Sequence, residues 1–179
     1  MIRNDARLVA QGYSHVEGID YDETLAPVTR MKSIRILLAL ACHLKFKLYQ
    51  IDVKTAFLNR LFKEDVYMAQ PKGFIDLHFL DHVLYLKKAL YGLKQAPRAW
   101  YDWLTQYLVS HGFTRGKADQ ILFIKKEDSK LILAQVYVDD IIFGSTKDEL
   151  AHGFSKLMQA EFEMSMIGGL TQFLGLQIR

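Results

Sequence analysis

Three aspartates have the types and spacing that could support metal chemistry. Asp139 and Asp140 are adjacent, at the join of two strongly apolar segments, and Asp52 ends a separate apolar segment. Neighbouring carboxylates repel each other, so one takes up a proton unless cations keep both ionised. If the strand ending at Asp52 pairs beside the join, three carboxylates converge at one sheet edge. Mg²⁺ prefers such oxygen ligands, and two ions about 3.5–4 Å apart suit in-line phosphoryl transfer.

Each aspartate also has a plainer interpretation. Asp is common in turns, so Asp139 and Asp140 could be simple hairpin residues, and Asp52 could cap the helical turn that follows it. Two-residue hairpins prefer glycine at their second position, where this sequence has Asp140. The turn sequence therefore weakens the plain interpretation of the adjacent pair, and both interpretations stay open on the residues alone.

The elements that must position these residues follow from hydrophobic spacing. Apolar residues at helical spacing predict helices over 32–43, from 96 to about 108 and from 150 to 162, the last with a capping box of Thr146 and Glu149. Apolar runs resume at Ile141 after two polar residues, which predicts a hairpin with Asp139 and Asp140 as its turn. Further strands are predicted at 7–10, 46–51, 66–68, 83–86, 121–124, 131–138 and 173–178.

This order of elements predicts the fold class. Helices and strands are mixed, with hairpins, and do not alternate strictly. The order favours an α+β fold, in which helices pack on one face of an antiparallel sheet, over a doubly wound parallel fold.

Composition excludes several classes of protein. The chain has 179 residues, half of them hydrophobic, which predicts one globular domain, or one domain plus a small lobe, with a sizeable core. The single cysteine, Cys42, excludes a disulfide framework, and the apolar stretch 36–42 is too short to span a membrane. We therefore expect a soluble intracellular protein. Its net charge of +3 permits a nucleic-acid partner without requiring one.

Three segments in fixed order carry a family resemblance: Asp52–Leu58 (DVKTAFL), Leu90–Tyr101 (LYGLKQAPRAWY) and Tyr137–Asp140 (YVDD). Together they resemble the core motifs of the reverse transcriptases of copia-type long-terminal-repeat retrotransposons. The resemblance covers essentially the whole chain. YVDD alone is a weak pattern, whereas the GLKQAPRAWY stretch is long and specific.

The resemblance implies a right-hand polymerase fold without its thumb. It places the fingers at about 1–46 and 61–93 and the palm at about 47–60 and 94–179. The implied activity is RNA-directed DNA polymerisation with two Mg²⁺ ions. The implied partners are an RNA or DNA template, a DNA primer and deoxynucleoside triphosphates, with no membrane partner, and the implied location is the cytoplasm, including virus-like particles.

The same resemblance implies roles for the acidic residues. Asp52 and Asp139 would be the principal ligands of the two metal ions, and Asp140 a third, more peripheral carboxylate. The segment Phe173–Leu176 would support the primer end.

Five further residues match family positions that contact the substrates. Phe57 would exclude a 2′-hydroxyl, and Gln95 and Arg7 would contact the incoming nucleotide; Gly92 and Tyr137 would lie at the template or primer. The residues alone also allow plainer interpretations. Phe57 could be an ordinary core phenylalanine, Gln95 a polar residue at a helix start and Arg7 a solvated surface arginine.

Three positions depart from the family pattern. Asp5 stands where the family usually has lysine, Arg60 where it usually has glycine, and Gly169 where it usually has a charged residue. With the carboxylates intact, we interpret the chain as a degenerating or partial copy. The alternatives are a catalytically inactive retrotransposon remnant or a non-enzymatic nucleic-acid-binding module. Another palm-type enzyme, such as a nucleotide cyclase, is opposed by the GLKQAPRAWY segment.

Two other patterns have weak functional interpretations. His78 and His82 have the spacing of metal ligands on one helix face, but a surface loop is favoured over a zinc site. Trp100, Trp103 and Tyr107 could stack on bases, but their helical spacing favours core positions.

Overall fold

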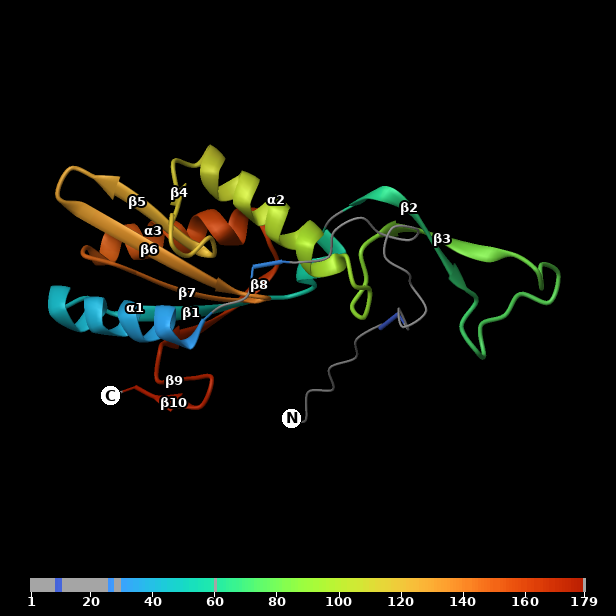
Figure 1. Ribbon diagram of the computed structural model, residues 1–179, viewed down its shortest axis with the longest axis horizontal. Helices are drawn as coiled ribbons and strands as arrows, with labels where there is room; N and C mark the ends of the chain where they lie inside the picture. Colours follow the sequence, from blue (N-terminus) through green and yellow to red (C-terminus); the bar gives the residue numbers. More distant parts are fainter. Residues whose placement is uncertain (1–8, 11–25, 28–29, 60, 179) are drawn as a thin grey trace. The chain divides into compact units, whose positions relative to one another are not determined.

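The computed structural model describes residues 9–10, 26–27, 30–59 and 61–178, without the side chains of residues 59 and 61–64. This part of the chain is a mixed α/β structure of antiparallel sheets and three α-helices (Figure 1). It divides into two units: a hairpin unit (Met1–Ala26 and Phe57–Trp103) and a sheet unit (Pro27–Ala56 and Leu104–Arg179). None of its helices has the length and apolar character needed to cross a membrane.

The elements follow one another in mixed order. They are α1 (Met31–Leu44), β1 (Leu48–Val53), the 3-10 helix η2 (Ala56–Asn59), β2 (Leu61–Ala69), β3 (Val83–Lys88), α2 (Ala96–Ser110), β4 (Thr114–Arg115), β5 (Leu122–Glu127), β6 (Lys130–Tyr137), β7 (Asp140–Ser145), α3 (Asp148–Glu161), β8 (Met164–Gly169), β9 (Gln172–Phe173) and β10 (Leu176–Gln177).

The sheet unit is built on a six-stranded sheet of order β4-β5-β6-β7-β1-β8, in which every neighbouring pair is antiparallel. The strands β4 to β7 follow one another along the chain. By contrast, β1 lies between β7 and β8, both of which come more than eighty residues later. The two strands that carry the aspartates are therefore direct neighbours.

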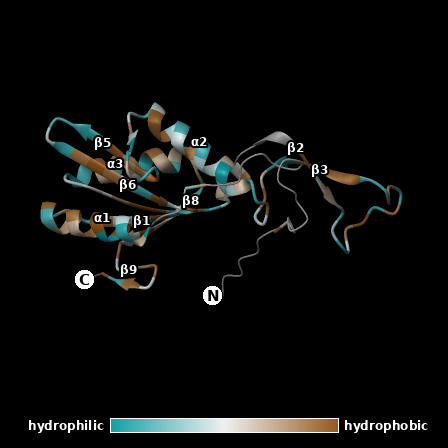
Figure 2. Cartoon of the chain, viewed as in Figure 1, coloured by the Kyte–Doolittle hydropathy of each residue, from teal (hydrophilic) through white to brown (hydrophobic). Residues whose placement is uncertain are grey.

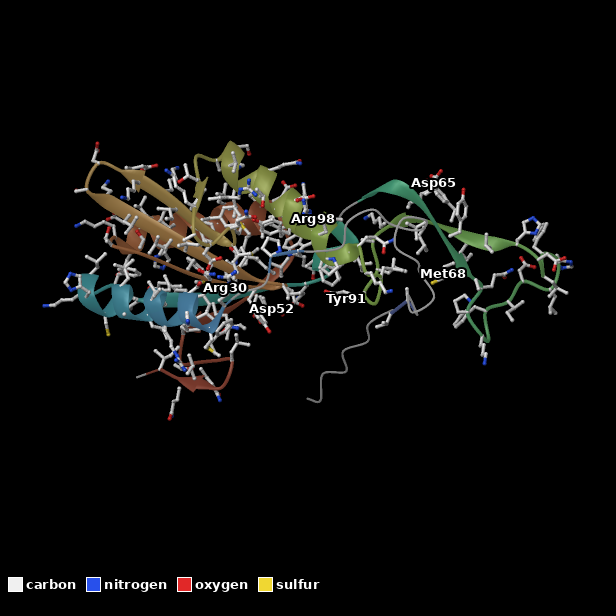
Figure 3. The ribbon with its side chains drawn as sticks, in the orientation of Figure 1. Arg30, Asp52, Asp65, Met68, Tyr91 and Arg98 are labelled. Atoms are coloured by element: carbon white, nitrogen blue, oxygen red, sulfur yellow. The ribbon has the colours of Figure 1, made fainter. Side chains whose placement is uncertain are left out.

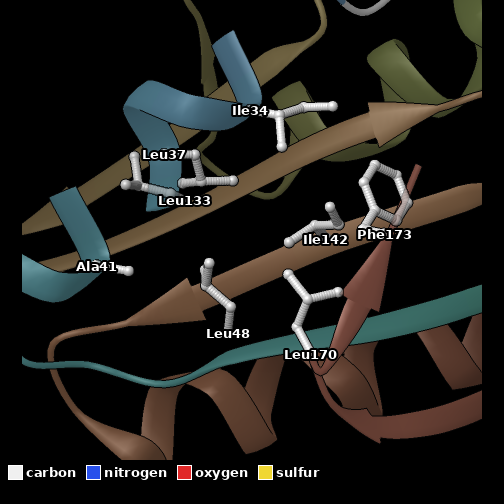
Figure 4. Packing of buried hydrophobic residues seen from close by; sticks show 8 residues of the cluster. All are labelled: Ile34, Leu37, Ala41, Leu48, Leu133, Ile142, Leu170 and Phe173. Atoms are coloured by element: carbon white, nitrogen blue, oxygen red, sulfur yellow. The ribbon is translucent and has the colours of Figure 1, made fainter. Parts of the chain in front are cut away.

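One face of this sheet is covered by α1. Its buried residues Ile34, Leu37 and Ala41 recur at helical spacing. They pack in one cluster with residues of the sheet and of the segment after β8: Leu48, Leu133, Ile142, Leu170 and Phe173 (Figure 4). Full burial of such a side chain contributes roughly 1.5–3 kcal/mol, so this cluster fixes α1 on the sheet.

The opposite face is covered by α3. Phe143 follows Ile142 in β7 and so points to the other face, where its ring lies 4.9 Å from that of Phe154 in α3. The expectation that helices pack on one face only is therefore wrong. Residues 132–136 of β6 are all buried, so both faces carry apolar side chains and both need a cover.

Two local expectations are also wrong. The capping box before α3 does not form, because Thr146 Oγ1 accepts a hydrogen bond from the backbone N–H of Leu131 at 3.0 Å instead. The segment 173–178 is not one strand, because Leu174 and Gly175 both have positive φ and turn the chain between β9 and β10. The strand expected at 7–10 shows only a bridge between Val9 and Tyr91, and residues 7 and 8 lie outside the described residues.

The hairpin unit is built on the antiparallel pair β2–β3, with the rings of Tyr67 and Tyr85 facing each other across the strands at 5.5 Å. Gln70 closes the long loop, since its amide nitrogen donates to the carbonyls of Phe79 and His82 at 2.7 and 2.9 Å. His78 also lies in this exposed loop, which confirms the loop interpretation. The hairpin carries many hydrophobic residues on its surface (Figure 2).

Candidate active site

The structure brings the three aspartates together in the sheet unit. Asp52 on β1 lies directly opposite Asp140 on β7. The backbone N–H of Val53 donates to the carbonyl of Asp139 at 2.9 Å, which ties the end of β1 to the turn before β7. Asp52 lies near the end of its strand (Figure 3). Three carboxylates thus share one end of the β7–β1 pair.

The pairing register explains why they meet. Directly opposed residues share a face of a sheet, and residues two apart on a strand share it too. Three successive rows on this face cross β6, β7 and β1 and change from apolar to acidic: Leu133–Gly144–Leu48, Gln135–Ile142–Gln50 and Tyr137–Asp140–Asp52. The first row belongs to the cluster under α1, so the packing that fixes the leucines also fixes the acidic row.

The turn between β6 and β7 differs from its prediction by one residue. Its two loop residues are Val138 and Asp139, and Asp140 already belongs to β7. Val138 has φ of 56°, a conformation that β-branched residues rarely adopt and that costs of order 1 kcal/mol or more. The turn that carries Asp139 is therefore strained.

The three carboxylates interact electrostatically. Burial raises the pKa of Asp140 above its ordinary value, the charges of Asp139 and Asp52 raise it further, and a hydrogen bond from Gln50 opposes them. That bond runs from Gln50 Nε2 to Asp140 Oδ1 at 2.9 Å. A cation placed among these groups would relieve the repulsion.

The donor chemistry fits Mg²⁺ in a particular way. All three side chains offer carboxylate oxygens, which hard divalent cations prefer. No group of three or more His, Cys, Asp or Glu side chains is arranged as a metal site within residues 30–59 and 61–178, and one oxygen of Asp140 is already held by Gln50. A Mg²⁺ site commonly needs only one or two carboxylates, which act with substrate phosphates.

Gln95 and Phe57 belong to the hairpin unit. Gln95 is only 5% exposed, and neither polar atom of its side chain has a hydrogen-bond partner among the described residues. An orphaned buried amide costs about 1–3 kcal/mol, which a polar ligand would recover. Phe57 is 6% exposed and its ring lies 4.6 Å from that of Tyr91, so it is a packed aromatic residue.

Gly92, also in the hairpin unit, is required by a close approach of the chain to itself. It has φ of 91°, and a Cβ atom there would overlap the carbonyl oxygen of Ala10. The backbone N–H of Ala10 donates to the carbonyl of Tyr91 at 2.7 Å. The residues beside Gly92 are thus held against the segment at Val9 and Ala10.

The remaining predicted residues have separate positions. Tyr137 ends β6 opposite Asp140, and its ring makes an edge-on contact with Phe173 at 5.8 Å. Gly169 lies in β8 with open space around its Cβ position, so glycine is not needed sterically there. Arg7, Asp5 and Arg60 lie outside the described residues.

The aromatic residues of α2 make packing contacts within the protein rather than forming an exposed surface for stacking on bases. Trp100 is 1% exposed and contacts Trp103 edge-on at 5.9 Å, within the hairpin unit. In the sheet unit, the hydroxyl of Tyr107 donates to the carbonyl of Leu157 at 2.8 Å. The core interpretation of Trp100 is confirmed.

Sequence reasoning missed Gln50. The signal was available, because Gln50 precedes Asp52 by two residues on a predicted strand and must share its face. What sequence could not supply is its partner, since Asp140 lies 90 residues away.

A cavity of about 270 Å³ in the sheet unit lies apart from the carboxylates. Ile132, one of its lining residues, points to the face of β6 opposite that of Gln135 and Tyr137. The other lining residues come from the segment after α2, from β5 and from α3, and include Phe113, Lys125, Glu149, Gly153 and Phe154.

The family model described as reverse transcriptase (RNA-dependent DNA polymerase) matches residues 1–179. The chain belongs to this family, and within it to the copia-type retrotransposon group that its motifs predicted. No solved structure matches the chain.

Three of the relatives are plant retrotransposon proteins. The chain is 42% identical over 177 residues to the retrovirus-related Pol polyprotein from transposon RE1 of Arabidopsis thaliana, covering 99% of this chain and 12% of that polyprotein. It is 43% identical over 178 residues to the RE2 polyprotein of the same plant, with the same coverage of each. It is 39% identical over 180 residues to the TNT 1-94 polyprotein of Nicotiana tabacum, covering 99% of this chain and 14% of that protein. The chain thus spans about an eighth of these relatives' length.

Proposed function

We propose that this chain is the polymerase module of a retrotransposon polyprotein, which adds deoxynucleotides to a DNA primer on an RNA or DNA template. The observation that carries the proposal is the pairing of Asp52 with Asp140, beside the bond from Val53 to Asp139, in a member of the reverse transcriptase family.

The three aspartates would form the site of the metal ions. Two Mg²⁺ ions, when bound, make the primer 3′-hydroxyl a better nucleophile and offset charge at the triphosphate. Asp52 on β1 and Asp139 in the turn before β7 would supply the carboxylates that bind them, and the backbone bond from Val53 to Asp139 ties the two positions together. Asp140 adds negative charge to the site and is held in place by Gln50. The chain's own contribution is therefore a set of three carboxylates, Asp52, Asp139 and Asp140, held at one end of the β7–β1 pair.

The nucleotide would be bound by residues of the hairpin unit. The two unpartnered polar atoms of Gln95 are suited to hydrogen bonds with the incoming nucleotide. Phe57, immobilised against Tyr91, suits a steric role against a 2′-hydroxyl. Arg7 would contact the triphosphate, where a guanidinium binds phosphate oxygens in pairs.

The template and primer would lie against Gly92 and Tyr137. In the right-hand description, the palm would correspond mainly to the sheet unit and the fingers mainly to the hairpin unit, and the contacts of α1 group it with the sheet unit. The setting of such a module would be the cytoplasm and virus-like particles.

Primer extension tests this proposal. The chain is incubated with an RNA template, a DNA primer, deoxynucleotides and Mg²⁺, beside Asp139→Asn and a matched control, Asp128→Asn. Asp128 is an exposed turn residue with φ of 53°, a conformation that asparagine adopts readily. We expect extension by the original chain and the control only. Extension that survives Asp139→Asn contradicts the proposal, and template–primer binding without extension in every version favours the non-enzymatic module.

A further inference from the structure

The acidic row has a neutral neighbour that shares its face. Gln50 lies opposite Ile142, and Asp52 lies opposite Asp140, so Gln50 and Asp140 are diagonal neighbours across the β1–β7 pair. Diagonal neighbours lie within reach of long side chains. Gln50 Nε2 uses this reach to donate to Asp140 Oδ1 at 2.9 Å.

A neutral donor at this point has a specific chemical consequence. An arginine or lysine in the same place would cancel the negative charge that a divalent cation needs. An amide satisfies one oxygen of the half-buried carboxylate and leaves the charge of the site unchanged. It also fixes the rotation of the Asp140 carboxylate, because only one of its oxygens faces Gln50.

We propose that Gln50 is a positioning residue, whose hydrogen bond holds Asp140 aside so that Asp52 and Asp139 receive the divalent cations. This inference rests on the proposed function and adds a positioning residue to it. Residues outside the ligand set that fix the groups around a metal site commonly contribute 10–100-fold to metal affinity or activity.

The sheet supplies a matched control in the same row. Gln135 lies opposite Ile142 from the other side, so the two glutamines flank one isoleucine on one face. Gln135 Nε2 also donates to a carboxylate oxygen, that of Asp119, at 3.1 Å. Asp119 is not part of the acidic row. The change from glutamine to methionine keeps the size of the side chain and removes the donor at either position.

The experiment measures Mn²⁺ binding by electron paramagnetic resonance, with the original chain, Gln50→Met and Gln135→Met, and no catalysis is needed. We expect the Kd for Mn²⁺ to rise about tenfold in Gln50→Met and to stay within twofold in Gln135→Met. In the Asp140→Ala background, Gln50→Met should have no further effect, because its acceptor is gone. Circular dichroism shows that each variant is folded, and Gln50→Asn, whose shorter side chain cannot reach, replaces Gln50→Met if needed.

Primer extension gives a second readout. We expect kcat to fall about tenfold in Gln50→Met with the KM for the nucleotide unchanged, and the Mg²⁺ concentration for half-maximal rate to rise. Equal Mn²⁺ affinity in Gln50→Met and Gln135→Met overturns the inference. If Asp139→Asn still abolishes extension in that case, the proposed polymerase function is kept and only the role of Gln50 is lost. If the original chain neither binds Mn²⁺ nor extends a primer, both are overturned.

Discussion

The two ends of the strands β6, β7 and β1 differ sharply in chemistry. At one end, Leu133 and Leu48 flank Gly144 and pack under α1, where the surrounding side chains are apolar. At the other end, the same strands present Tyr137, Asp140 and Asp52. One pairing register sets both rows, so the free energy gained at the apolar end also holds the carboxylates against their mutual repulsion.

Substitutions at the two ends of these strands should have different consequences. A change at the acidic end should remove chemistry and leave the fold intact. A substitution at the apolar end should lower the stability of the fold. It should lower activity only if it shifts the pairing register of the strands. A shift by one residue would send every side chain of a strand to the other face.

The largest effect is expected at the acidic end. Replacing Asp52 with Asn removes a charged metal ligand and keeps the size of the side chain. We expect kcat for primer extension to fall by about 10³-fold or more, as for loss of other charge-stabilising groups in active sites. The midpoint of thermal unfolding should not fall. A variant that loses stability and activity together would place Asp52 in the structural part of the row.

The next effect is expected at the apolar end. A Cβ atom on Gly144 would lie 2.6 Å from the carbonyl oxygen of Lys47 and 2.9 Å from a methyl carbon of Leu48. We therefore expect Gly144→Ala to lower the free energy of unfolding by about 2 kcal/mol, measured by urea denaturation. The matched control is Gly169→Ala, because open space surrounds that position on β8. Equal stability of the two variants would contradict the packing described here.

A smaller effect of opposite sign is expected at Asp140. Its pKa is higher in the folded chain than in the unfolded one, where it is ordinary. The folded chain therefore binds more protons between these two values, and stability falls as the pH rises through that window. Above that window the burial and repulsion that raise this pKa oppose folding, so Asp140→Asn, which keeps an acceptor for Gln50, should raise the midpoint of thermal unfolding at neutral pH.

The pH dependence of that gain is the check. The stabilisation by Asp140→Asn should disappear as the pH falls below the ordinary aspartate range, because the original side chain is then protonated in both states. Unfolding midpoints measured from acid to neutral pH give this difference directly. A gain that grows as the pH falls would show that the repulsion among the three carboxylates has been misassigned.

The smallest effect is expected at the strained turn. Val138→Gly relieves a β-branched residue of its left-handed conformation at φ of 56°, but adds chain entropy to the unfolded state. We expect a net stabilisation of about 0.5 kcal/mol, measured by thermal unfolding. Val109→Gly, at an exposed position in the last turn of α2, is the control and should destabilise by about 0.3–0.5 kcal/mol, because glycine is a poorer helix former than valine.

The turn between β6 and β7 also shows what could be predicted from the sequence and what could not. The apolar runs on both sides of Asp139 predicted the hairpin correctly, but turn preferences placed its loop at Asp139 and Asp140, one residue too late. No local preference favours Val138 at positive φ. The surrounding pairing imposes it, because the register that buries Ile142 leaves no other residue to turn.

Long-range contacts set the same limit elsewhere. Helical spacing predicted α1, α2 and α3, and the motifs predicted the family. The position of β1 between β7 and β8 follows only from the whole sheet, so the link from Gln50 to Asp140 could not be located in advance. The almost continuous apolar run from Leu131 to Val138 predicted that both faces of β6 are covered, and the burial of residues 132–136 confirms it.

The most direct test of metal binding by Asp52 and Asp139 is to locate the metal ion in a crystal. Crystals of the chain with template–primer, a deoxynucleoside triphosphate and Mn²⁺ would be measured at an anomalous wavelength. We expect a Mn²⁺ peak bound by carboxylate oxygens of both Asp52 and Asp139, with Asp140 still accepting the hydrogen bond from Gln50. A bound triphosphate whose Mn²⁺ contacts neither Asp52 nor Asp139 would contradict the account.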